Sequence, residues 1–336
     1  MRVVISNFSR PLPSRKNFRR QWKRAELPPP GPRVALFEQE ERWGFHLYAL
    51  GVYLRDLGIA DRIEFWDFRP DRRVFYLSNG VLKVTFHNED DVAAYLARFG
   101  PPDLFVNHGQ NGVPVLKLLA DQVFRVHVPT RRRATDHLGH AECFLLDAED
   151  QLVDRSMIYI PVVNTERFRP GDGTTVRDFV YLASCYGGKR HDLLVDAVRG
   201  TELTGHLHPV GPTQLDLSNT HITTSDLDER DAVELLQGSR IAVYPADLTS
   251  NPAAMWECVA AGLPIVMNDA IWGGKHLVVP GVTGELAAED HFLDTMRSVL
   301  ANRARYSARE YFVETWDTVT LLEEYIEFFR RMGWNG

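Results

Sequence analysis

The chain of 336 residues is too long for one ordinary hydrophobic core and has the length of two domains of about 150 residues each. Its 44% hydrophobic and 25% charged residues are typical of a soluble globular protein, and no apolar run approaches the roughly 18 residues of a membrane-spanning helix. The net charge of −7 argues against general nucleic-acid binding. Because the first residues lack a signal-peptide core, we expect a cytoplasmic protein.

A basic segment runs from Arg10 to Arg24 and contains seven basic residues and no acidic one. It is followed by PPPGP, residues 28–32, which is a stiff, non-helical stretch. One interpretation is a solvated loop. The other is a patch that contacts a phosphorylated acceptor or an anionic membrane surface, which would place the protein peripherally at the inner face of the membrane.

Strand-like and helix-like runs alternate along the first half of the chain, a pattern typical of parallel sheets covered by helices. A β-hairpin interrupts the alternation, because two apolar runs flank the turn dipeptide Asn79-Gly80. The expected strands are Arg2–Ser6, Arg33–Glu38, Arg62–Asp67, Arg73–Ser78, Val81–His87, Asp103–Asn107, Val123–Val128, Glu142–Asp147 and Met157–Val162, and the expected helices are Gly44–Leu57, Asp90–Arg98 and Val113–Ala120.

A domain boundary is predicted at residues 164–177, where periodicity is lost and Gly, Pro and Thr accumulate. A second strand–helix series follows it. The expected strands are Phe179–Ser184, Gly205–Val210, His221–Thr224, Arg240–Tyr244 and Leu263–Met267, and the expected helices are Arg190–Val198, Glu229–Gln237, Asp290–Leu300, Ser307–Arg331 and one that begins at Asn251 and ends at Gly262.

The last helix carries six aromatic residues, and its length would let it return to the first domain. We therefore expect an N-terminal domain of residues 1–163, a C-terminal domain of residues 164–309, and a returning segment at about 310–332. Two doubly wound α/β domains leave a ligand-binding crevice at the carboxyl ends of their strands.

The stretch SNPAAMWECVAAGLPIV, residues 250–266, places a charged Glu257 inside an apolar helix. Asn251 is predicted to cap this helix and Pro252 to occupy its first position. A carboxylate among apolar neighbours needs a hydrogen-bonding partner, a cation or a polar ligand.

The second half resembles the donor-binding domain of retaining glycosyltransferases of the GT-B fold, family 4. The resemblance lies in NTERFRP, in YLASCYGGKRHDLLVDAV, in HITTSDLDERDAVELLQGSRIAVYPA and above all in NPAAMWECVAAGLPIVMNDAIWGGKHLVVPGVTGEL, in family order and spacing. The first half is only loosely similar. The resemblance implies a transferase that moves a sugar from a nucleoside diphosphate donor to a small-molecule, saccharide or lipid-linked acceptor, with retention of configuration and without a metal or other cofactor.

By position, Glu257 matches the family glutamate that accepts hydrogen bonds from the donor ribose. Lys189 matches the lysine that meets the diphosphate, and Gly188 and Arg190 flank it at a helix start that favours anions. The helix start formed by Thr249, Ser250, Asn251, Pro252 and Ala253 is a further candidate contact for phosphate or sugar.

His127 resembles the family histidine that points into the cleft near the transferred sugar. A histidine between apolar neighbours is equally typical of a core residue, and both interpretations stay open. Lys275, which also follows Gly-Gly, is a candidate second contact for phosphate or sugar.

The chain departs from the family at two positions. Thr249 stands where the family has a first glutamate, and Ser184 stands where it has an arginine; Asp247 and Arg190 are the nearest replacements. These departures leave three alternatives: a rearranged contact through Asp247, a deoxysugar donor, or lost catalysis in a non-catalytic nucleotide-sugar-binding subunit that partners an active transferase. A sugar-nucleotide epimerase also fits two such domains, but the sequence offers no set of acid–base residues for it.

Overall fold

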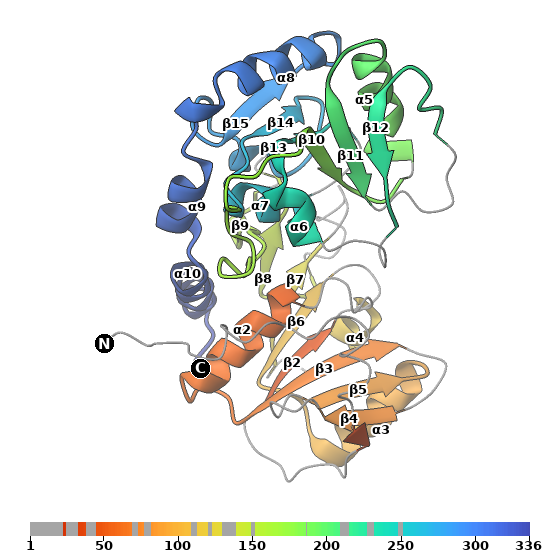
Figure 1. The fold of residues 1–336 in the computed structure, drawn as a ribbon. Helices are drawn as coiled ribbons and strands as arrows, with labels where there is room; N and C mark the ends of the chain where they lie inside the picture. Colours follow the sequence, from red (N-terminus) through yellow and green to blue (C-terminus); the bar gives the residue numbers. More distant parts are fainter. Residues whose placement is uncertain are drawn as a thin grey trace. The chain divides into compact units, whose positions relative to one another are not determined.

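The computed structural model describes residues 23–24, 33–37, 45–68, 73–76, 82–108, 113–119, 123–129, 139–148, 152–185, 187–208, 215–226, 232–247 and 251–336. The chain divides into two compact units (Figure 1). Unit 1 comprises residues 1–162 and 321–336, and unit 2 comprises residues 163–320.

Unit 1 is built on a mixed sheet with the strand order β1-β4-β5-β3-β2-β6-β7-β8-β9 in its described part. All neighbouring strands are parallel except the hairpin β4–β5 and the pair β1–β4. The strands are β1 Lys23–Arg24, β2 Arg33–Phe37, β3 Arg62–Phe68, β4 Arg73–Tyr76, β5 Leu82–Phe86, β6 Leu104–His108, β7 Phe124–Val128, β8 Cys143–Leu146 and β9 Ser156–Ile158, and the helices between them are α2 Phe45–Asp56, α3 Glu89–Phe99 and α4 Val113–Leu118.

The predicted hairpin is confirmed, since Arg73 pairs with Thr85 and Tyr76 with Leu82 in antiparallel register. Its turn, Asn79-Gly80, and the expected strand Arg2–Ser6 lie outside the described residues. Within the basic segment, only Lys23 and Arg24 are described, and they form the short strand β1 against β4. A two-residue strand has no period of its own, so the sequence did not predict it.

The core of unit 1 surrounds Trp66, whose ring meets those of Phe86, Tyr95 and Phe105 at centroid distances of 5.3–5.7 Å. Beside it lies a fully buried carboxylate, Glu64, which accepts hydrogen bonds from the Trp66 indole at 2.7 Å and the Tyr95 hydroxyl at 3.0 Å. Arg62 forms an ion pair with the same carboxylate at 2.5 Å. This acid is satisfied by the protein itself, as burial of a charge requires.

Unit 2 is built on a parallel sheet with the strand order β12-β11-β10-β13-β14-β15. Helix α8 packs over β13, β14 and β15 (Figure 1). The strands are β10 Arg177–Leu182, β11 Thr204–His208, β12 His221–Thr224, β13 Ser239–Tyr244, β14 Ile265–Asn268 and β15 Gly284–Ala287, and the helices are α5 His191–Val198, α6 Ala232–Gln237, α7 Ala253–Ala260, α8 Phe292–Ala301 and α9 Ala308–Trp316, with short 3-10 turns η3 Gly187–Lys189, η4 Lys275–Leu277, η5 Glu289–His291 and η6 Arg303–Arg305.

The sequence did not predict strand β15, which contains no β-branched residue. Its first residue approaches the neighbouring strand closely, because a Cβ on Gly284 would lie 2.0 Å from the Ile265 carbonyl oxygen. This backbone contact requires glycine and depends on tertiary structure.

The expected single helix Ser307–Arg331 is wrong. The structure has two helices, α9 and α10 Thr318–Arg331, separated at Asp317, whose ψ of 140° is not helical. The Asp317 carboxylate accepts a hydrogen bond from the Val319 backbone N–H at 3.1 Å and so caps the second helix. Helix α9 packs on α7 in unit 2, whereas most of α10 belongs to unit 1.

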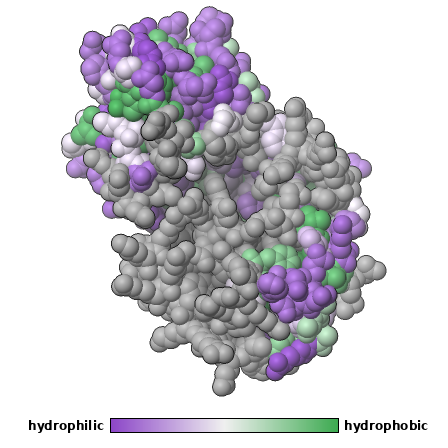
Figure 2. Space-filling model, turned by 90° about the vertical axis from the view of Figure 1, so that its right-hand side faces the viewer, coloured by the Kyte–Doolittle hydropathy of each residue, from purple (hydrophilic) through white to green (hydrophobic). Residues whose placement is uncertain are grey.

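Cys143 and Cys258 are buried, Cys185 is half-buried, and all three are free thiols. None of the helices in the described part of the chain combines the length and apolarity needed to span a membrane. On the face that Figure 2 shows, hydrophilic side chains predominate over the described surface, with small hydrophobic areas between them.

Candidate donor site at the carboxyl ends of the unit 2 strands

A tight turn connects strand β10 to helix α5 and carries Lys189 and Arg190. Residues Gly187–Lys189 form the 3-10 turn η3, and Arg190 then adopts a left-handed conformation with φ 48° and ψ 46° before α5 begins at His191. L-residues other than Gly, Asn and Asp rarely adopt this conformation. The Tyr181 hydroxyl donates a hydrogen bond to the Lys189 carbonyl at 2.7 Å and so attaches the turn to β10.

Lys189 points into unit 2 and is only 7% exposed. Its Nζ donates to the Tyr244 hydroxyl at 3.3 Å and lies 5.5 Å from the centroid of the same ring. Burial lowers the pKa of the ammonium group from 10.5 to about 8. Burial likewise lowers the pKa of the neighbouring His191 to about 4. A cation kept in this environment gains stability when an anion binds beside it.

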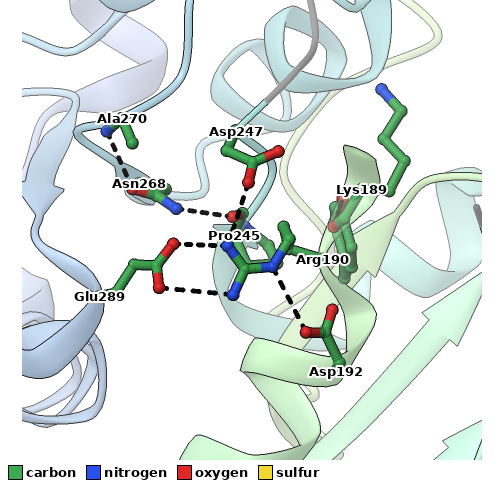
Figure 3. Close-up of polar contacts among 9 residues, drawn as sticks. Lys189, Arg190, Asp192, Pro245, Asp247, Asn268, Ala270 and Glu289 are labelled. Carbon is green, nitrogen blue, oxygen red and sulfur yellow. Dashed lines mark hydrogen bonds and ion pairs between the residues drawn. The ribbon is translucent and has the colours of Figure 1, made fainter. Parts of the chain in front are cut away.

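Arg190 extends away from Lys189 and contacts three carboxylates (Figure 3). Its guanidinium donates to Asp247 Oδ2 at 3.0 Å, to Glu289 Oε1 at 2.5 Å and Oε2 at 3.4 Å, and to Asp192 at 3.4 Å. These acids, Glu289 first, raise the pKa of Arg190 above its usual range. The two adjacent cations that the sequence suggested for one diphosphate therefore differ in orientation and in partners.

The loop after β13 contacts Arg190 and is held in place by a hydrogen bond from strand β14. Asn268, the buried last residue of β14, donates from Nδ2 to the Pro245 carbonyl at 2.9 Å. Two residues later, Asp247 binds Arg190 through Oδ2, whereas its Oδ1 is buried and has no hydrogen-bond partner among the described residues. Thr249 and Ser250, the next candidate contacts, lie outside that part of the chain.

Helix α7 begins at Ala253, with Pro252 as its N-cap, so the predicted capping role of Asn251 is wrong. The Asn251 side chain instead accepts a hydrogen bond from the Trp256 indole N–H at 2.5 Å. A buried indole donor needs a partner, and this requirement outweighs the local capping preference.

Glu257 lies in the second turn of α7 on a half-buried position. Among the described residues, its carboxyl group makes no hydrogen bond and no ion pair within 4 Å. Burial raises its pKa from 4.5 to about 7, although the positive charge of Arg167 acts in the opposite direction. By contrast, the Glu64 carboxylate in unit 1 accepts two hydrogen bonds and forms an ion pair with Arg62, so of these two acids Glu257 is the candidate for binding a ligand.

A second Gly-Gly-Lys turn lies against the start of α7. Gly274 has φ 80°, and a Cβ there would lie 2.6 Å from Met255 Cε and 3.0 Å from Asn251 Oδ1. The side chain of Lys275 lies on an exposed position and makes no hydrogen bond or ion pair to any described residue. The next residue, His276, was not predicted from the sequence to belong to the site. Its ring centroid lies 5.3 Å from that of Trp256, and its buried Nε2 has no partner among the described residues.

His127 belongs to unit 1, where it is fully buried on β7 beside Asn107 of β6. The Asn107 amide donates to His127 Nδ1 at 2.8 Å, so a neutral ring carries its proton on Nε2. His127 is therefore placed at the carboxyl end of a parallel strand in unit 1, and the other candidates lie in unit 2.

Lys189, Asp247 and Glu257 share one edge of the unit 2 sheet, because they follow the carboxyl ends of the adjacent parallel strands β10 and β13. In open α/β sheets, this edge is where ligands bind. A buried cation favours phosphate, and a carboxylate oxygen without a partner among the described residues favours hydroxyl groups, so this edge is the candidate site for a ligand that carries both.

No protein-family model and no curated protein matches the sequence. Solved structures match over most of its length. Sucrose-phosphate synthase from Thermosynechococcus elongatus has a TM-score of 0.74 at 13% identity and covers 90% of this chain and 99% of its own. HepE of Anabaena, solved with UDP and glucose, has a TM-score of 0.69 at 12% identity and covers 90% and 100%. AviGT4, a glycosyltransferase of avilamycin A biosynthesis, has a TM-score of 0.63 at 15% identity and covers 90% and 98%. The chain therefore has the GT-B fold, as the resemblance of its second half predicted.

Proposed function

We propose that the protein is a glycosyltransferase that transfers a sugar from a nucleoside diphosphate donor to an acceptor hydroxyl, with retention of configuration and without a metal. The observation that carries the proposal is that two groups follow the carboxyl ends of adjacent parallel strands: the buried cation Lys189, and the carboxyl of Glu257, which has no partner among the described residues. The GT-B fold supports it, because HepE with the same fold was solved with UDP.

In this proposal, Lys189 and the first N–H groups of α5 contact the diphosphate. Glu257 accepts hydrogen bonds from the vicinal ribose hydroxyls, for which a carboxylate is the natural acceptor. The helix start at Asn251, Pro252 and Ala253 adds backbone contacts to phosphate or sugar. Asp247 Oδ1 accepts a sugar hydroxyl in place of the family glutamate, which is Thr249 in this chain.

The transfer step forms a bond between the acceptor oxygen and the sugar's anomeric carbon while the bond from that carbon to the diphosphate oxygen breaks. The bonding electrons remain on the diphosphate, whose growing charge Lys189 stabilises more in the transition state than in the ground state. The acceptor proton passes to a departing phosphate oxygen, so no general base is assigned. For His127, contact with the transferred sugar stays a prediction.

The acceptor is a small molecule, a saccharide or a lipid-linked molecule. The basic segment Arg10–Arg24 would serve a phosphorylated or membrane-bound acceptor.

The test is a thermal-shift panel of UDP, GDP, ADP and their sugar conjugates. A ligand at 100 times its dissociation constant stabilises by roughly 2.7 kcal/mol. If none of these compounds shifts the melting temperature, the proposal fails.

The second candidate function is a non-catalytic nucleotide-sugar-binding subunit that partners an active transferase. It is favoured by Ser184 and Thr249, and by the pairing of Arg190 with three carboxylates. Both functions predict donor binding. Slow hydrolysis of the best-binding nucleotide sugar in the absence of acceptor is expected only of the enzyme.

A further inference from the structure

Arg190 combines an unfavourable backbone conformation with an unusually dense set of ion pairs. A φ of 48° is rare for a side chain of this type, and Arg190 and Asn219 are the two non-glycine residues of the described chain that have a positive φ. Such a conformation persists where the surrounding structure holds it in place. At Arg190, the backbone N–H donates to the Gly187 carbonyl at 3.2 Å and the backbone carbonyl accepts from the Leu194 N–H at 3.4 Å, and the side chain adds ion pairs to three carboxylates.

The contacts of the guanidinium join three separate segments of the sheet edge. Asp192 belongs to the first turn of α5, Asp247 to the loop after β13, and Glu289 to the 3-10 turn after β15. Glu289 is held in fork geometry, with NH1 on Oε1 and NH2 on Oε2. This planar two-bond contact fixes the orientation of both groups.

The loop that Arg190 reaches is itself attached to the strand between β13 and β15. Asn268 at the end of β14 binds Pro245 with its amide nitrogen and Ala270 with its oxygen (Figure 3). The ends of β10, β13, β14 and β15 are thereby linked through Arg190 and Asn268. The η3 turn, which directs Lys189 inward, is part of the same network.

We infer that Arg190 is a positioning residue of the donor site, which acts through Asp247 and Glu289 to hold the η3 turn in the conformation that presents Lys189 to the donor diphosphate. The inference rests on the proposed function and goes beyond it, because it assigns Arg190 and Glu289 no contact with the ligand. The charge of Arg190 is already balanced by carboxylates, and its side chain points away from that of Lys189.

Glu289→Gln gives a test that depends on the sign of the effect. If Arg190 contacted the diphosphate directly, removing a competing carboxylate would strengthen UDP binding. The positioning role predicts the reverse, a UDP dissociation constant several-fold higher, because the fork contact that holds the turn is lost. Isothermal titration measures the dissociation constants of UDP and of uridine. We expect the affinity for uridine to stay unchanged, because uridine has no diphosphate.

Three substitutions of Arg190 distinguish the effect of its backbone conformation on UDP binding from the effect of its side-chain ion pairs. Arg190→Ala removes the ion pairs and keeps the backbone penalty, so we expect UDP to bind at least roughly tenfold more weakly, the scale of residues that orient a ligand's contacts. Arg190→Gly removes the same ion pairs but tolerates φ 48°, so its loss is expected to be smaller. Arg190→Lys keeps the charge without the fork and is expected to lose affinity as well; retained affinity would favour direct phosphate contact.

The matched control is Arg199→Ala. Arg199 belongs to the other end of α5 and also pairs with two carboxylates, those of Asp196 and Asp216. Its substitution is expected to leave UDP affinity unchanged. Wild-type protein that binds none of UDP, GDP and ADP overturns the proposed function and this inference with it. Wild-type protein that binds UDP while Arg190→Ala and Glu289→Gln bind it equally well overturns the positioning role alone.

Discussion

The Tyr325 hydroxyl on α10 makes two hydrogen bonds to one residue far away in the sequence, Ile160. It donates to the Ile160 carbonyl at 2.6 Å and accepts from the Ile160 N–H at 2.7 Å. The tyrosine is 2% exposed, and burial first of all raises the pKa of its hydroxyl well above the usual range. The contact attaches the C-terminal helix to the last residues of the first part of unit 1, directly before the chain enters unit 2.

Tyr325→Phe removes both hydrogen bonds and leaves the Ile160 backbone groups without that partner. We expect a loss of about 1–3 kcal/mol in the stability of unit 1. Hydrogen exchange of the Ile160 amide measures the local effect without assuming that the whole chain unfolds in one step. The control is Tyr306→Phe. In the wild type, the Tyr306 hydroxyl donates to the partly exposed Glu285 carboxylate at 2.9 Å, so we expect a smaller loss of stability and no change in the exchange of the Ile160 amide. Equal protection of Ile160 in wild type and Tyr325→Phe would contradict the expected role.

Glu257 makes stability depend on pH with an unusual sign for a carboxyl group. Its folded pKa of about 7 is above the usual 4.5, so the folded state holds this proton more tightly than the unfolded state does. Stability therefore falls as pH rises from 4.5 to 7, and the full penalty is present above pH 7. Glu257→Gln should be more stable than wild type at about pH 8, by on the order of 1 kcal/mol for a half-exposed residue.

The same substitution should weaken UDP binding roughly tenfold, because an amide accepts the ribose hydrogen bonds less well than a carboxylate. Melting curves across the acidic, neutral and alkaline range, with and without UDP, test both effects. Glu310→Gln, on an exposed position of α9, is the control for a lost negative charge. A ligand-induced shift of the melting temperature that is the same in Glu257→Gln and in wild type would end the ribose assignment.

Lys189→Met should affect binding and stability in opposite directions. The substitution replaces a buried charged side chain with a neutral one of similar length and shape, so we expect the melting temperature at neutral pH to be unchanged or higher. We expect UDP affinity to fall about 10- to 100-fold, since a charge-assisted contact to phosphate is lost. Lys117→Met, on an exposed position of α4, should change neither. A variant that melts lower and still binds UDP as wild type does would contradict this role of Lys189.

The donor affinity of the wild type should pass through a maximum between about pH 7 and pH 8. Lys189, whose pKa is about 8, must be protonated to meet a diphosphate. Glu257, whose pKa is about 7, must be ionised to accept two hydroxyl hydrogens. Titration with UDP across this range measures the affinity as a function of pH. In Lys189→Met, we expect the decrease of affinity at alkaline pH to disappear and the decrease at acidic pH to remain. An affinity that stays constant across both pKa values would exclude both groups from the site.

Much of the fold follows from local sequence patterns, because parallel strands buried on both faces form short apolar runs between helices. Strand β12 was predicted with its observed bounds, and the hairpin followed from its turn dipeptide. The errors lie where individual side-chain hydrogen bonds decide. Asn251 bonds a tryptophan indole instead of capping α7, and Asp317 breaks the expected long helix.

The candidate site was predictable to a similar degree. The positions of Lys189 and Glu257 follow from a glycine turn and from an acid within an apolar helix. The partners of Arg190 did not follow, because Glu289 is 99 positions away in the sequence and reaches it only through the order of the strands. His276 was missed for the same reason, since only its contact with Trp256 sets it apart.

Gly274→Ala should disturb the candidate site through the start of α7. The residue has φ 80°, and the added Cβ would lie 2.6 Å from Met255 Cε and 3.0 Å from the Asn251 oxygen that accepts the Trp256 hydrogen bond. Gly281→Ala is a matched control, because Gly281 has φ 74° and a Cβ added there would meet nothing within 4 Å. Both variants incur the backbone penalty of about 1 kcal/mol, and Gly274→Ala alone adds a steric one. We therefore expect a lower melting temperature for Gly274→Ala than for Gly281→Ala, and weaker UDP binding in the former only. Thermal melts and UDP titration of the pair decide the point, and indistinguishable variants would show that the Gly273-Gly274 turn does not support the start of α7.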